Sequence, residues 1–144
     1  MSQTPKHPDP RAVVDRLVEA MLKNDPVAAA AVYSEDVVIV DPLFDVVGRE
    51  AAVTAFAAWF DAFRITSLEV AESVVEDSRI ALRWVWTAIH QGPYLDIPAS
   101  GKEFKGWNVI FFDTRDGLIT RDLSTWDCTQ YLALNEIGER GPDG

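Results

Sequence analysis

The chain has 144 residues, of which 48% are hydrophobic, and a formal net charge of −10. This length suits one domain that buries roughly two-thirds of the surface of its unfolded chain, and five Trp and seven Phe residues exclude extensive disorder. The negative charge argues against nucleic acid or an anionic membrane as a partner, because both need clustered Lys and Arg. Solubility explains the acidic residues better than a cationic ligand does.

Cysteine content and the N-terminus point to a cytoplasmic protein. Cys128 is the only cysteine, so no intramolecular disulfide can form and an oxidising compartment is not implied. A small buried hydrophobic residue is the preferred interpretation of this cysteine, ahead of a reactive thiolate. The polar residues 1–9 lack the apolar stretch of a signal peptide, and no apolar run approaches the roughly 18 residues of a membrane span.

Apolar periodicity predicts three helices in the first half of the chain. Asp-Pro pairs at positions 9–10 and 25–26 each place an N-cap before a proline at the first helical position. Apolar residues then recur at helical spacing. The predicted helices span residues 10–23, 26–33 and 49–64.

The remaining segments predict strands. They are short or β-branched, and turn residues bound them, as in the Thr-Arg-Asp-Gly hairpin at 114–117. The predicted strands span residues 37–41, 66–76, 79–90, 103–113 and 118–127. Residues 42–48 are interpreted as a loop and 128–137 as a short terminal helix.

This order of elements predicts a single α+β domain over residues 10–138, flanked by tails at 1–9 and 139–144. Three helices must cover one face of a strongly curved, mostly antiparallel sheet. A sheet bent in that way makes a cone with a hollow end. A pocket for a small apolar molecule therefore follows from the architecture.

No cofactor is expected. The only histidines are His7 and His90, so no cluster of His, Cys and carboxylates has the spacing of metal ligands. No Gly-rich phosphate loop follows a predicted strand, which argues against a nucleotide. The candidate chemistry therefore rests on polar side chains within apolar strands.

Asp41 is the first of these side chains. It ends the apolar run VVIVD and precedes Pro42. A carboxylate on the face of Val37 and Ile39 would be partly desolvated, and its pKa would rise toward that of a useful general base. A strand-end aspartate in an Asx-turn before proline is an equally good interpretation.

Two further polar residues share strand faces with large apolar ones. His90 has the same parity as Trp84 and Trp86, which places it at the end of an aromatic-lined face or simply at the end of a strand. Asn108 shares parity with Ile110 and could donate to a ligand oxygen or bond only to its neighbours. The tryptophan stripe itself is more typical of a core than of a binding surface.

The last predicted strand ends at Trp126 and Asp127. Alternation with period two cannot decide which of two sets faces the pocket, because a single bulge would exchange them. One set comprises Asp122, Ser124 and Trp126. The other comprises Leu123, Thr125 and Asp127.

Two long segments resemble known families. VYSEDVVIVDPLFDVVGREAAVTAFAAWF resembles the ketosteroid isomerase segment in which a strand-end Asp before Pro is the general base. HQGPYLDIPASGKEFKGWNVIFF, DGLITRDLSTWD and LALNEIG resemble SnoaL-like polyketide cyclases, with their His-x-Gly, Gly-Lys and final-strand Asp. Together these segments cover most of residues 10–138. Both families belong to the cone-shaped superfamily named after nuclear transport factor two, which is the fold that the resemblance implies.

The resemblance assigns site residues position by position. Asp41 falls on the isomerase base, and Asp127 falls on the acid/base aspartate of the SnoaL-like cyclases. The isomerase tyrosine that donates to the substrate oxygen falls on Leu17, and its partner acid falls on Asn108. Loss of one oxyanion donor typically costs about 10²–10³ in rate, so the resemblance argues against an ordinary steroid isomerase.

We therefore expect a cofactor-independent cyclase or isomerase that acts on a polyketide-like or terpenoid carbonyl compound. Asp127, or as the second choice Asp41, would remove a proton beside the carbonyl. His90 and Asn108 would hydrogen-bond the enolate oxygen. The residues expected to bind the substrate are Asn108, Trp126, Trp84, Trp86, Leu17, Phe56 and Phe60.

Two alternatives stay open at this point. Asp41 and Asp127 could instead be the acid and base of an epoxide hydrolase or an epoxide-opening cyclase, if both approach a common oxygen. The chain could also be a non-catalytic binding or dimerisation module, which a pocket filled by its own Trp and Phe side chains would favour. The resemblance further implies a homodimer that pairs through the outer face of the sheet.

Overall fold

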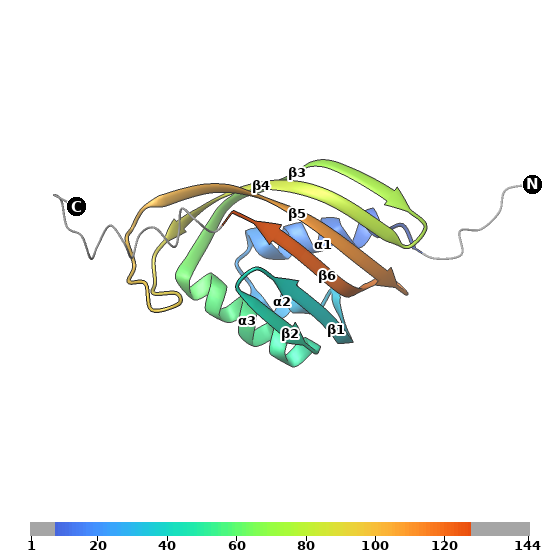
Figure 1. Ribbon diagram of the computed structural model, residues 1–144, viewed down its shortest axis with the longest axis horizontal. Helices are drawn as coiled ribbons and strands as arrows, with labels where there is room; N and C mark the ends of the chain where they lie inside the picture. The colour runs from blue at the N-terminus through green and yellow to red at the C-terminus, as the bar shows by residue number, and fades with distance from the viewer. Residues whose placement is uncertain (1–7, 128–144) are drawn as a thin grey trace, which may run out of the picture.

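The computed structural model describes residues 8–127, in which one curved sheet arches over the helices (Figure 1). The helices are α1 (Pro10–Leu22), α2 (Pro26–Ala30) and α3 (Arg49–Ala62). The strands are β1 (Tyr33–Asp41), β2 (Phe44–Val47), β3 (Phe63–Glu76), β4 (Arg79–His90), β5 (Glu103–Arg115) and β6 (Leu118–Trp126). The α+β class and the curved sheet are confirmed.

The first two helices begin where the caps predict. The side chain of Asp9 accepts a hydrogen bond from the backbone N–H of Arg11 at the start of α1, and Asp25 caps α2 in the same way. Helix α1 buries one apolar face, including the fully buried Leu17. Helix α2 is shorter than predicted, because Tyr33 is the first residue of β1.

The sheet has the order β2-β1-β6-β5-β4-β3. Only β1 and β6 run parallel among these neighbours, and the other pairs are antiparallel. The register between β3 and β4 shifts twice, after Ile65 and after Val70. Such bulges bend and twist the strands that contain them, so they increase the curvature.

The structure corrects two boundaries. The predicted loop at 42–48 contains β2, which forms an antiparallel hairpin with β1 in which Val40 pairs with Asp45. Strand β3 starts at Phe63, directly after α3, so the predicted helix over 49–64 was slightly too long. The predicted terminal helix at 128–137 and Cys128 lie outside the described residues.

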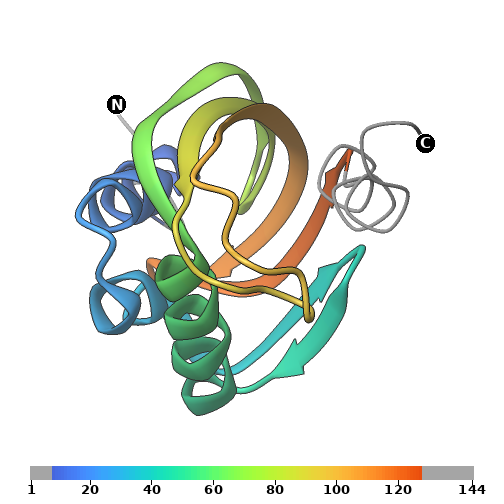
Figure 2. The same ribbon diagram turned by 90° about the vertical axis from the view of Figure 1, so that its left-hand side faces the viewer.

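Viewed from one end, the sheet curls around an interior that the three helices flank on one side (Figure 2). Apolar residues from α1, α3 and the concave side of the sheet fill most of this interior. The part that stays unfilled lies between α3 and the strands β1, β6, β5 and β4, whose residues line it. The hollow expected from the architecture is therefore present.

Candidate functional site

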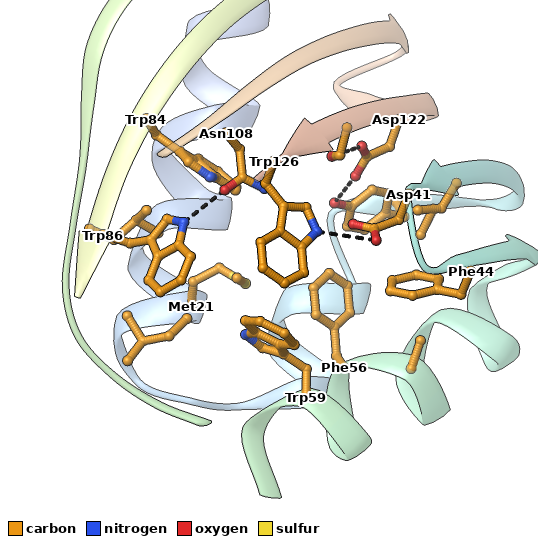
Figure 3. Close-up of a pocket in the computed structure, with 16 residues that line it drawn as sticks. Met21, Asp41, Phe44, Phe56, Trp59, Trp84, Trp86, Asn108, Asp122 and Trp126 are labelled. Atoms are coloured by element: carbon orange, nitrogen blue, oxygen red, sulfur yellow. Dashed lines mark hydrogen bonds between the residues drawn. The ribbon is translucent and has the colours of Figure 1, made fainter. Parts of the chain in front are cut away.

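The main cavity has a volume of about 110 Å³ and is lined mostly by aromatic and aliphatic side chains (Figure 3). Its aromatic lining residues are Tyr33, Phe44, Phe56, Trp59, Trp84, Trp86 and Trp126. Its polar lining residues, besides Tyr33, are Asp41, Asn108, Asp122 and Ser124. An apolar cavity with a few convergent polar groups is the usual form of a small-molecule site.

Asp41 lies at the end of β1, with its carboxylate facing the cavity (Figure 3). Its Oδ1 accepts hydrogen bonds from the backbone N–H of Leu43 at 3.0 Å and from the indole N–H of Trp126 at 3.3 Å. The first bond is the Asx-turn that the sequence suggested. Burial raises the pKa of Asp41, and the two hydrogen bonds offset part of that rise. The turn and the pocket-facing position therefore coexist.

Asp122 lies beside Asp41, on the neighbouring strand β6, and is buried. Its Oδ2 accepts a hydrogen bond from the Tyr33 hydroxyl at 2.8 Å, and its Oδ1 accepts one from the Ser124 hydroxyl at 2.6 Å. Burial raises the pKa of Asp122 to about 6. The hydrogen bonds from Ser124 and Tyr33 lower the pKa and offset part of this rise, whereas the charge of Asp41 adds to it. Asp122 can therefore hold or release a proton near neutral pH.

A bulge decides which residues of β6 face the cavity. The β5–β6 register shifts between the pairs Asp113–Arg121 and Thr114–Ile119, which leaves Thr120 as an extra residue. The inward face therefore changes parity after the buried Ile119. Asp122, Ser124 and Trp126 face the cavity. They are the first of the two sets that the sequence left open.

Asn108 occupies the cavity wall on β5, between its cross-strand partners Trp84 and Trp126. Its side-chain oxygen accepts a hydrogen bond from the indole N–H of Trp86 at 2.7 Å. Trp59 on α3 completes the wall and meets Trp86 and Trp126 edge to face. Three tryptophans from separate elements thus hold one another in place.

The structure places four other predicted residues away from this cavity. His90 is buried at the end of β4, stacked on Phe63, and its Nδ1 accepts from the backbone N–H of Ser100 at 3.2 Å. Leu17 and Phe60 are buried in the core. Asp127 is exposed just after β6, beside a smaller cavity of about 80 Å³ that shares the lining residues Trp59, Trp86 and Trp126 with the main one.

The structure thus brings together Asp41, Asn108, Phe56, Trp84, Trp86 and Trp126 from the predicted set. Tyr33 was missed because the alanine-rich run before it favoured a longer helix. Asp122 and Ser124 were named only as one possible face of the last strand. The available signal was that Asp122 and Ser124 are polar and two residues apart, which places them on one face of the strand. Only the bulge in β6 determines that this face points into the cavity.

No group of three or more His, Cys, Asp or Glu side chains among the described residues could hold a metal ion. None of the helices between residues 8 and 127 combines the length and the apolar character needed to cross a membrane.

Comparisons with known proteins agree with this geometry. Residues 14–122 match the SnoaL-like domain family. No match was found among the curated proteins.

Several solved structures share the fold at low sequence identity. A protein of Jannaschia sp. CCS1, provisionally named a SnoaL-like polyketide cyclase, superposes with a TM-score of 0.79 at 19% identity, over 93% of this chain and 96% of that one. AclR of Streptomyces galilaeus, provisionally named a hydroxylase, gives 0.75 at 23% identity, over 88% and 81%. A protein of Catenulispora acidiphila with a ketosteroid isomerase-like fold, solved with trimethylamine, gives 0.72 at 17% identity, over 93% and 95%. The chain belongs to the SnoaL-like domain family, within the superfamily named after nuclear transport factor two.

Proposed function

We propose that the protein is a cofactor-independent cyclase or isomerase that acts on a small apolar carbonyl compound by general acid–base chemistry. The observation that carries the proposal is the pair of carboxylates at one end of an aromatic cavity. Asp41 and Asp122 come from adjacent strands, both have raised pKa values, and the charge of one acts on the other. Pairs of carboxyl groups whose surroundings differ are typical of acid–base sites.

The two carboxyl groups suit different roles. Asp41 has one oxygen bonded to Leu43 and Trp126, and it would take a proton from the carbon beside the substrate carbonyl. The enolate formed would carry its charge on an oxygen near Asn108. In a ring closure, the enolate carbon attacks a second carbonyl carbon, and the oxygen of that carbonyl takes the proton of neutral Asp122. In an isomerisation, Asp41 returns its proton to a different carbon.

Asp122, and not Asp127, is the proposed second acid–base residue beside Asp41. The Asp127 side chain is exposed beside the smaller cavity, whereas Asp122 is 6% exposed and shares the main cavity with Asp41. Burial in apolar surroundings is what raises a carboxyl pKa into the useful range. A direct comparison of the turnover of Asp127→Asn with that of Asp41→Asn and Asp122→Asn tests this choice.

A second candidate, an epoxide hydrolase or epoxide-opening cyclase, is favoured by the same pair. Asp122 as a neutral acid would protonate the epoxide oxygen while Asp41 activates water or an internal hydroxyl for attack on carbon. The C–O bond of the epoxide breaks as the new C–O bond forms. This candidate would be favoured if the purified protein hydrolyses styrene oxide and if Asp41→Asn and Asp122→Asn both lose that activity.

Opening of 5-nitrobenzisoxazole tests the proposal without knowledge of the natural substrate. This probe needs only a base that removes one C–H proton, and its product is coloured. We expect Asp41→Asn to lower kcat/KM by roughly 10²–10⁴, the usual contribution of a positioned base. Asp45→Asn is the matched control, because Asp45 is an exposed carboxylate on the adjacent strand β2. Equal rates in wild type, Asp41→Asn and Asp45→Asn would falsify the assignment of the base.

A further inference from the structure

Trp86 lies flat against a glycine on the neighbouring strand. Gly106 is its cross-strand partner, and a Cβ built on Gly106 would overlap the six-membered ring of Trp86, at 2.8 Å from Cε2 and 3.0 Å from Cη2. Real Cβ atoms essentially never come closer than 3.0 Å to such a neighbour. The indole can therefore keep this position only while residue 106 has no side chain.

In this position Trp86 sets the orientation of the Asn108 amide. The indole N–H can only donate a hydrogen bond, so it must face the amide oxygen and not the amide nitrogen. The bond from Nε1 to Oδ1 is 2.7 Å long, and Figure 3 shows it at the wall of the cavity. The amide oxygen is thereby occupied, and the amide NH₂ remains as a donor on a residue that lines the cavity.

Three other donors at the cavity are already engaged with the carboxylates. The hydroxyls of Tyr33 and Ser124 donate to Asp122, and the indole N–H of Trp126 donates to Asp41. These three groups hold the acids and are not available to hold a ligand oxygen. The Asn108 amide has the opposite character, because its acceptor is used and its donors are not.

We propose that Trp86, seated on Gly106, is a positioning residue that turns the Asn108 amide N–H toward the cavity, where it holds the carbonyl oxygen of a compact, neutral substrate. The carboxylate pair and the apolar walls disfavour an anionic ligand, and the volume of about 110 Å³ suits a molecule of about one ring. This inference rests on the proposed function for the fate of the bound carbonyl. The hydrogen bond from Asn108 to a ligand carbonyl can form whether or not the protein is a catalyst.

Acetophenone is the probe for this geometry, because it is neutral, has one ring and offers a single acceptor oxygen. Binding is followed by quenching of the tryptophans that line the cavity, and the hydrogen bond by the infrared C=O stretch of the bound probe, assigned with a ¹³C-carbonyl label. A hydrogen bond lowers this frequency. We expect Asn108→Ala to shift the band upward and to weaken binding by about three- to tenfold.

Trp86→Phe and Gly106→Ala remove the positioning in two independent ways. The first deletes the indole N–H, and the second displaces the intact indole. Each is expected to move the C=O band toward its position in Asn108→Ala. Trp107→Phe is the matched control, because Trp107 is exposed on the outer face of β5, the strand that carries Gly106 and Asn108. It should leave the band unchanged, and circular dichroism is used to check that each variant is folded.

A double-variant cycle separates positioning from plain packing. If Trp86 acts through Asn108, Trp86→Phe has no further effect on the band in the Asn108→Ala background. The proposal is overturned by a band that stays at the wild-type position in Trp86→Phe, by a further shift of the double variant relative to Asn108→Ala, or by no saturable binding of acetophenone. Asp41→Asn is expected to keep the band shift while losing turnover, so this inference and the proposed function fail separately.

Discussion

Replacing Asp122 by asparagine should change how the stability of the protein depends on pH. Asp122 is fully buried, and its pKa is raised to about 6 from an ordinary 3.8, chiefly by that burial. Between these values the folded chain keeps a proton that the unfolded chain has released. The carboxyl therefore contributes its full stability below about pH 4, and this contribution is lost as the pH rises to 6.

The size of the effect follows from the two pKa values. Their difference of about two pH units is worth about 3 kcal/mol, at about 1.4 kcal/mol for each unit. Roughly 2–3 kcal/mol of this falls between pH 4 and pH 8, since the unfolded carboxyl is already partly ionised at pH 4. An asparagine side chain can accept from one of the hydroxyls of Tyr33 and Ser124 and donate to the other, so the network stays filled without a titrating group.

Urea unfolding of wild type and Asp122→Asn at one-unit steps from pH 4 to pH 8 measures this effect. All other titrating groups are common to both proteins, so the difference in the free energy of unfolding isolates Asp122. We expect the variant to gain about 2–3 kcal/mol relative to wild type over this range. A difference that stays constant within about 0.5 kcal/mol, or that changes in the opposite direction, would refute the view that burial keeps this carboxyl protonated.

Four further predictions concern the site and the assembly. Asp41→Asn should lower the pKa of Asp122, because the charge of Asp41 raises it; a carboxyl ¹³C NMR titration that gives an unchanged or higher value contradicts this. Gly92→Ala should destabilise the fold by roughly 1–3 kcal/mol, because a Cβ there would overlap the backbone carbonyl oxygen of Asp61; urea unfolding equal to wild type would count against it. Dialysis against a chelator should leave the opening of 5-nitrobenzisoxazole unchanged, and a stoichiometric metal in untagged protein would end this expectation. Sedimentation at micromolar concentration should show the homodimer that the family resemblance implies, and a monomer would reject it.

The long elements could be predicted because their patterns are local. Helix α1 begins at its predicted proline, and β4 spans the predicted residues 79–90, since burial on one face imposes a period on each. The short elements could not. Strand β2 has four residues between Pro42 and Gly48, and it is a strand only because β1 pairs with it.

The candidate site divides in the same way. Asp41 and Asn108 could be found from the sequence, because each is a polar residue next to an apolar run of its strand. Tyr33 could not, since its preceding residues favour a helix and only its pairing with Ile119 places it in β1. The orientation of the Asn108 amide likewise depends on a tryptophan 22 residues away.

The sequence by itself determined the class of the fold, the hollow end of the sheet and the aromatic character of the candidate site, because composition and periodicity carry these properties. Only the tertiary structure decided which aspartates share the cavity. A single extra residue, Thr120, reverses the inward face of β6, so that Asp122 joins Asp41 while Asp127 is exposed. Side chains alternate with period two along a strand, and the pairing register of the neighbouring strands is what assigns that alternation to a face.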